Sequence, residues 1–216
     1  MQPLRNPLSI GLLLLLAMLT TACDQPMESP LASTKTVAVH VEIDASTIAS
    51  DDPMAVIDPV WWRGNIYAGP EAYEGSLGSF TKAQRFVWAI LWYDAEVNNG
   101  GHDQFYGNST GIVWRDALSG FEAIGAPEAA AILRESADRL GGSPSLDREE
   151  REQKLEELAP DFSDLDDRYY ALEKTVDVHA KMMAYIRSRP GDFMFSGSVE
   201  KPAPDLPPFL GPPATW

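Results

Sequence analysis

The residues best suited to chemistry lie between Leu91 and Gly111, where carboxylates, amides and one histidine stand beside aromatic rings. Carboxylates and histidine act as general acids and bases, and carboxylate and amide oxygens are ligands for hard cations. The Asn-Asn-Gly-Gly segment in the middle predicts a turn, because Gly adopts positive φ and Asn bonds to its own backbone. With Asp94 just before them, the candidate site residues are Glu96, Asn98, Asn99, Gly100, Gly101, His102, Asp103, Gln104 and Asn108.

Two interpretations fit this polar cluster, residues 94–108. In the first, it is a structural corner whose amides and carboxylates cap the backbone between two helices. In the second, it is a small polar pocket, and the protein is a small envelope hydrolase or a metal-dependent enzyme. His40, His102 and His179 are far apart, and the sequence has neither a His-Glu-x-x-His zinc motif nor a phosphate-binding glycine loop. We therefore favour the corner and expect a non-enzymatic protein without catalytic, metal or cofactor sites.

The N-terminal segment indicates where the protein is located. Met1–Leu19 carries one cation, Arg5, before an apolar run that is too short to span a bilayer and is typical of a signal peptide. The run ends in Leu-Thr-Thr-Ala-Cys, which resembles a bacterial lipobox, and Cys23 is the only cysteine in the chain. We expect residues 1–22 to be a lipoprotein signal peptide and residues 23–35 a tether. Lipidation of Cys23 would anchor the protein in the bacterial cell envelope, on the periplasmic side of the inner or outer membrane.

The chain is acidic, with a formal net charge of −15 at pH 7. Nonspecific binding to nucleic acid needs a cationic surface, so the composition excludes direct nucleic-acid binding and suggests an unidentified protein partner instead. Helical spacing in Ser143–Leu158 predicts an ion pair between Asp147 and Arg151. The candidate acidic surface on this stretch consists of Glu149, Glu152, Glu156 and Glu157.

The hydrophobic pattern predicts a mainly α protein with a single compact helical domain over residues 36–189. Alternating apolar residues predict one short N-terminal strand over 36–43, whereas 45–58 is expected to be mostly loop. A capping box at Thr81–Gln84 begins an apolar helix that ends near the Asn-Gly turn. Apolar spacings of three and four predict one amphipathic helix over 169–186. Repeated prolines predict an extended, disordered tail over 190–216.

Two carboxylates of the cluster, Asp94 and Glu96, fall near the C-terminal end of the apolar helix, where the helix dipole disfavours negative charge. A compensating donor is therefore required. The backbone N–H groups that open the next helical segment, around His102–Gln104, are the expected donors to Glu96.

The same stretch carries a family resemblance. Residues 98–105 followed by Asn-Ser-Thr-Gly at 108–111, with Tyr73, Gln84-Arg85 and Tyr169 around them, resemble the C-terminal domain family of the DNA-mimic proteins over roughly residues 59–186. The resemblance implies a mostly helical domain with no known catalytic activity. The family takes its name from a member whose acidic surface resembles DNA and occupies a DNA-binding protein. A true DNA mimic that sequesters such a basic protein is therefore an alternative to an interaction module of unknown physiological role.

Overall fold

The structure, a computed structural model, describes residues 35–203 of the 216-residue chain. The expected signal peptide, Cys23 and most of the tether lie outside the described residues, as does the end of the expected tail from residue 204 onward. Within 35–203, no helix combines the length and the apolar character needed to cross a membrane.

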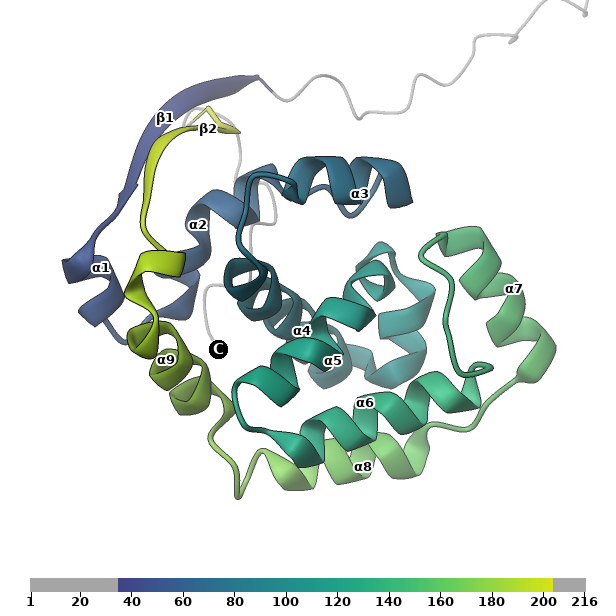
Figure 1. The fold of residues 1–216 in the computed structure, drawn as a ribbon. Helices are drawn as coiled ribbons and strands as arrows, with labels where there is room; N and C mark the ends of the chain where they lie inside the picture. The colour runs from purple at the N-terminus through teal and green to yellow at the C-terminus, as the bar shows by residue number, and fades with distance from the viewer. Residues whose placement is uncertain (1–34, 204–216) are drawn as a thin grey trace, which may run out of the picture. The chain divides into compact units, whose positions relative to one another are not determined.

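The predicted mainly α fold is confirmed (Figure 1). A short two-stranded sheet accompanies the helices. The elements are β1 Thr36–Ile43, α1 Ala45–Ala49, α2 Pro53–Arg63, α3 Pro70–Leu77, α4 Lys82–Gly107, the 3₁₀ helix η1 Ser109–Val113, α5 Trp114–Ala123, α6 Pro127–Arg139, α7 Arg148–Leu158, α8 Ser163–Leu172, α9 Val178–Ser188, the 3₁₀ helix η2 Pro190–Asp192 and β2 Phe195–Pro202.

Helix α4 is the element on which the others pack. Its predicted capping box is present, because Thr81 accepts the N–H of Gln84 and the side chain of Gln84 accepts the N–H of Thr81. Helices α2, α5, α7 and α8 all contact α4 (Figure 1). The residues of its first half that are buried in this way are Ala83, Gln84, Val87, Trp88, Ala89, Ile90, Leu91, Tyr93 and Val97.

The prediction of an extended, disordered tail over 190–216 is wrong for its first part. Residues 195–202 form β2, which pairs antiparallel with β1 from Thr36↔Pro202 to Ile43↔Phe195. Only Phe195 and Val199 are large apolar residues in this strand, so the sequence shows little of the alternation that reveals a strand. The strand forms because its main chain pairs with β1, and this pairing leaves no side-chain pattern in the sequence. The predicted strand 36–43 is present as β1.

Two other elements differ from expectation. Most of the expected loop 45–58 is helical, because α2 begins at Pro53 under an Asp52 N-cap and buries Val56, Ile57 and Val60. The expected helix 169–186 is two helices, α8 and α9, separated by residues 173–177. Asp177 caps α9 by accepting the N–H of Ala180 at 2.7 Å. The apolar stripe continues across this break, so its periodicity does not reveal it.

Candidate functional site at the break in helix α4

The predicted turn is a sharp break inside α4. Gly100 (φ −156°) and Gly101 (φ 73°, ψ −172°) leave the helical conformation. The positive φ of Gly101 is a backbone conformation that side chains with a Cβ rarely adopt. A Cβ on Gly101 would also collide with the carboxylate of Asp166, which lies against the backbone at this point. The glycine is therefore required both by its conformation and by the close approach of α8.

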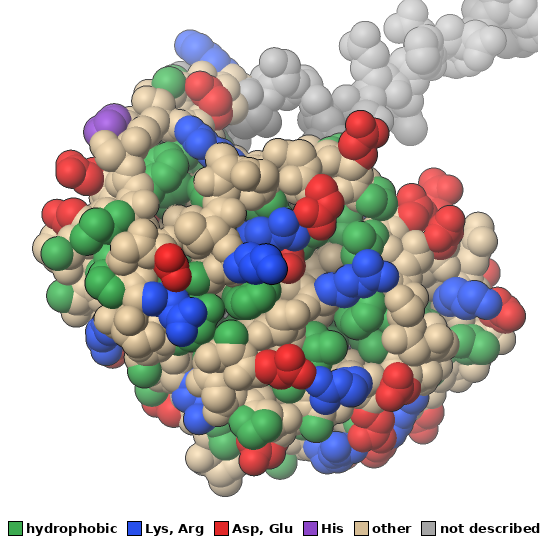
Figure 2. Space-filling view, in the orientation of Figure 1, with side chains coloured by type: hydrophobic (Ala, Val, Ile, Leu, Met, Phe, Trp, Pro, Cys, Tyr) green, Lys and Arg blue, Asp and Glu red, His purple; other side chains and the backbone are tan. Residues whose placement is uncertain are grey.

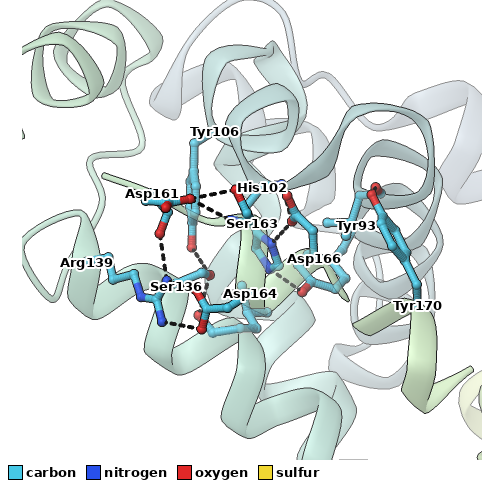
Figure 3. Close-up of polar contacts among 12 residues, drawn as sticks. Tyr93, His102, Tyr106, Ser136, Arg139, Asp161, Ser163, Asp164, Asp166 and Tyr170 are labelled. Carbon is cyan, nitrogen blue, oxygen red and sulfur yellow. Dashed lines mark hydrogen bonds and ion pairs between the residues drawn. The ribbon is translucent and has the colours of Figure 1, made fainter. Parts of the chain in front are cut away.

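The carboxylate of Asp166, on α8, holds the helical segment that follows the break. Its Oδ1 accepts the backbone N–H of His102 at 3.0 Å and lies 2.5 Å from Nδ1 of the same residue (Figure 3). The expectation that Glu96 accepts these N–H groups is therefore wrong. A negative charge at this point favours the helix, because the exposed N–H groups of a helix N-terminus carry partial positive charge. Sequence reasoning missed Asp166, since nothing local marks a partner 64 positions away.

His102 extends this contact into the core. Its Nε2 lies 2.8 Å from the hydroxyl of Tyr93, and both residues are 0% exposed. With the Asp166 carboxylate as acceptor, Nδ1 carries the ring proton and Nε2 accepts the Tyr93 hydroxyl. Burial lowers the pKa of His102 below its ordinary value, although the neighbouring Asp166 opposes this shift. Both ring nitrogens are thus engaged inside the protein.

Glu96 links the two halves of α4 through side chains instead of backbone. Its Oε2 accepts the side-chain amides of Gln104 at 2.6 Å and of Asn108 at 2.9 Å. Asn99 and Asp103 are exposed, and the pKa of Asp103 is raised, chiefly by partial burial and next by the nearby Asp166. The structure therefore brings Glu96, Gln104 and Asn108 together and leaves Asn99 and Asp103 at the surface.

The far end of α4 is held by cations from α7. Arg151 is 1% exposed and donates Nε to the carbonyl of Tyr106 at 3.0 Å and Nη2 to that of Asn108 at 2.8 Å. The predicted pair between Arg151 and Asp147 is wrong, because Asp147 instead caps α7 by accepting the N–H of Glu150 at 3.1 Å. Burial lowers the pKa of Arg151 to about 10. The last carbonyls of a helix carry partial negative charge, so a cation there is favourable.

A second polar cluster lies on the solvent side of α4, just before the break. The side-chain amide of Asn98 donates to Oδ1 of Asp94 at 3.3 Å and to Oε1 of Glu173 at 2.8 Å. The hydroxyl of Tyr169 donates to the same Asp94 oxygen at 2.7 Å. Burial, together with the neighbouring Glu173 carboxylate, raises the pKa of Asp94 to about 7. We call Asp94, Asn98 and Glu173 the open cluster, and Tyr93, His102 and Asp166 the sealed cluster.

The candidate acidic surface lies on α7. Glu149, Glu156 and Glu157 are exposed, and Glu152 is half-buried. Two of the four are paired within the helix, Glu152 with Arg148 at 2.9 Å and Glu157 with Lys154 at 2.6 Å. In Figure 2, carboxylates gather at the position of α7, with basic side chains among them.

The described residues also limit what chemistry the cluster offers. Within 35–203, no three His, Cys, Asp or Glu side chains are placed to hold one metal ion together. His102 has no free ring nitrogen for a substrate, and His179 lies on α9, away from the break. The arrangement around His102 is thus suited to joining helices.

Together, these features define a mainly α protein whose central helix is broken at a glycine pair and held by two charged groups, the partly buried Asp166 at the break and the buried Arg151 at the far end. The family model described as DMP19-like protein matches residues 78–189, which include α4, its break and the helices α5, α7 and α8 that pack on it. The chain belongs to this family, and the predicted family resemblance is confirmed. No curated protein and no solved structure matches the chain.

Proposed function

We propose that this protein is a non-enzymatic, acidic interaction domain, anchored in the cell envelope by a lipid on Cys23, that binds a basic partner protein through α7 and α8. The observation that carries the proposal is the charge of residues 147–177, where the sequence holds twelve acidic and five basic residues. An acidic surface of this kind steers a cationic partner toward it and rejects anionic ones.

The structure makes α7 more acidic at its surface than the sequence suggests. Of the three cations on this helix, Arg151 is buried and donates to carbonyl groups, so it does not neutralise the surface. Arg148 also donates to a carbonyl, that of Gly107 at 2.9 Å, besides pairing with Glu152. Only Arg151 is thus withdrawn from the surface, whereas Arg148 and Lys154 stay exposed and pair with Glu152 and Glu157. Glu149, Glu150 and Glu156 form no ion pair within the described residues, and this supports an excess of carboxylates on α7.

A non-enzymatic role is supported by the sealed cluster. A general base needs a free position within hydrogen-bond reach of its substrate. His102 has none, since one ring nitrogen contacts Asp166 and the other Tyr93.

The test compares two variants with the same change in charge. One converts Glu149, Glu152, Glu156 and Glu157 to Gln; the matched control converts Glu42, Glu71, Glu128 and Glu200, which are exposed and lie elsewhere. Each tagged protein is used to capture partners from envelope membranes. The proposal expects a protein captured by the wild type and the control to be lost with the α7 variant, and its capture to weaken as salt rises. Capture that is equal for all three proteins would reject the α7 surface as the binding site.

The lipid anchor has its own test. Cys23→Ser removes the thiol that would be acylated, so the protein is expected to move from the membrane fraction to the soluble fraction. Fractionation that does not change would contradict the anchor without bearing on the α7 surface.

A true DNA mimic is the second candidate, favoured by the exposed carboxylates of α7. Residues three and four positions apart on a helix are about 5–6 Å apart at Cβ, so such carboxylates form a row on the helix surface. A mimic occupies the DNA site of its partner. Duplex DNA should then displace the captured protein from this domain, whereas a partner that binds elsewhere stays bound in the presence of DNA.

A further inference from the structure

A cavity of about 240 Å³ lies where the N-terminus of α2, the middle of α4 and the connection between α8 and α9 meet. Its walls are largely apolar and include Met54, Leu91, Val176 and Met182. Pockets for drug-sized ligands begin at about 300 Å³. This cavity therefore suits a group the size of one side chain or a short aliphatic molecule.

Four carboxylates surround this apolar space. They come from three different parts of the fold: Asp52 before α2, Asp94 on α4, and Glu173 and Asp177 between α8 and α9. None of the four forms an ion pair with another residue of the described chain. The one basic side chain among the lining residues is that of His179. Asp52, Glu173 and Asp177 are exposed to solvent and Asp94 is half-buried. The cavity thus combines apolar walls with a rim of carboxylates that have no cationic partner among the described residues.

Each of these carboxylates uses one of its two oxygens in the hydrogen bonds of the described chain. Oδ1 of Asp52 and Oδ1 of Asp177 accept the backbone N–H groups that begin α2 and α9. Oδ1 of Asp94 and Oε1 of Glu173 share the amide of Asn98. No N–H or O–H group of the other described residues donates to the second oxygen of any of the four, and the Asp94 and Glu173 carboxyl groups hydrogen-bond to each other when one of them is protonated. Up to four acceptors therefore remain for a ligand that brings its own N–H donors.

We propose that this cavity binds a primary ammonium group on an aliphatic stem, the chemistry of a lysine side chain or of a free alkylamine. The stem would lie against the methionine, leucine and valine side chains, as the methylene chain of lysine does on apolar surfaces. The ammonium group has three N–H donors, which match single oxygens from separate carboxylates. The raised pKa of Asp94 fits this assignment, because a neighbouring cation would relieve the burial of its charge.

Other cations fit the cavity less well. Quaternary ammonium groups are recognised by aromatic cages, and none of the residues that line this cavity is Phe, Tyr or Trp. Guanidinium groups prefer to pair with both oxygens of one carboxylate, and here one oxygen of each carboxylate is already occupied. The inference does not depend on the α7 surface, which lies on another helix.

The experiment titrates the full-length ¹⁵N-labelled chain with n-butylamine and with Nα-acetyl-lysine methylamide. Both amines are expected to shift the signals of the Asn98 side-chain amide and of the Ala180 backbone amide. n-Butanol, with the same stem and no charge, and tetramethylammonium, with charge and no N–H donor, are expected to leave these signals in place. If the lysine derivative binds as well as butylamine, the group comes from a protein; if only butylamine binds, it is a free amine.

Variants then locate the binding. Glu173→Gln and Asp94→Asn each remove one charged acceptor and are expected to weaken butylamine binding about tenfold. Glu173 is exposed, so its variant tests the cavity even if Asp94→Asn impairs folding. Glu128→Gln, at an exposed position on α6, is expected to bind as the wild type does. Absence of shifts with both amines, equal shifts with butanol or tetramethylammonium, or unchanged affinity in Glu173→Gln would each overturn the proposal.

Discussion

The sealed cluster and the open cluster lie within a few residues of each other on α4, and each joins α4 to a carboxylate from another part of the chain, Asp166 on α8 in the sealed cluster and Glu173 just after α8 in the open one. In the sealed cluster one carboxylate, Asp166, faces two donors of His102, and the ring is 0% exposed. In the open cluster two carboxylates, Asp94 and Glu173, share one amide at the edge of a cavity. The sealed cluster thus has two donors for one carboxylate, whereas the open cluster has one shared amide for two carboxylates.

This difference teaches what distinguishes a structural polar cluster from one available to a ligand. Buried polar groups stabilise a fold when each finds a partner, and the sealed cluster meets this condition. In the open cluster two carboxylates lie beside each other, and burial, together with the neighbouring Glu173 carboxylate, raises the pKa of Asp94 although the Tyr169 hydroxyl that donates to it opposes this shift. Changes in the sealed cluster should therefore affect stability, and changes in the open cluster should affect titration and ligand binding.

The largest effect is expected from Asp166→Ala. This change leaves the backbone N–H and Nδ1 of the buried His102 without an acceptor, and unsatisfied buried donors are costly. We expect a loss of about 3 kcal/mol in the free energy of unfolding, measured by urea denaturation. The neighbouring Asp167 is exposed, and Asp167→Ala should change stability by less than about 0.5 kcal/mol. Equal effects of the two substitutions would show that the sealed cluster does not stabilise the fold.

Gly101→Ala should have the next largest effect. The alanine would have to adopt a φ of 73° and its Cβ would push against the Asp166 carboxylate. We expect a loss of about 2 kcal/mol in the same measurement. Gly75 lies inside α3 with open space around it, so Gly75→Ala should instead stabilise the protein by about 0.5 kcal/mol. A stabilising effect at both positions would mean that the break tolerates a helical residue.

The sequence predicts local features of this region well. The position of the break follows from the conformational freedom of consecutive glycines, and the start of α4 follows from its capping box. The partners of the break could not be predicted, because Asp166 reaches it from a separate helix, whereas local spacing favours Glu96, which is nearer in sequence, as the acceptor. The burial of Arg151 has the same cause, since its acceptors are carbonyl groups, which every residue carries and no motif reveals.

The two clusters should also have opposite effects on the free energy of unfolding as the pH decreases. The lowered pKa of His102 means that the unfolded state binds more protons just below pH 6.5, so stability falls as pH decreases. The pKa of Asp94, raised from 3.8 to about 7, means that the folded state binds more protons in this interval, so stability falls as pH increases. Asp94→Asn removes the second contribution alone. Its unfolding free energy should therefore fall more steeply than that of the wild type between pH 7 and pH 5, and equal slopes would contradict the opposition.

The smallest effect on stability is expected from Glu173→Gln, and this substitution separates the clusters most cleanly. Glu173 is exposed, and a glutamine keeps an oxygen that can accept the Asn98 amide, so stability should change by less than about 0.5 kcal/mol. The substitution does remove the negative charge beside Asp94, and an NMR titration of the Asp94 carboxyl carbon should show its pKa moving down from about 7. If the pKa of Asp94 does not move, burial alone sets it. The two carboxylates would then titrate independently, and the charge of Glu173 would not be what distinguishes the open cluster from the sealed one.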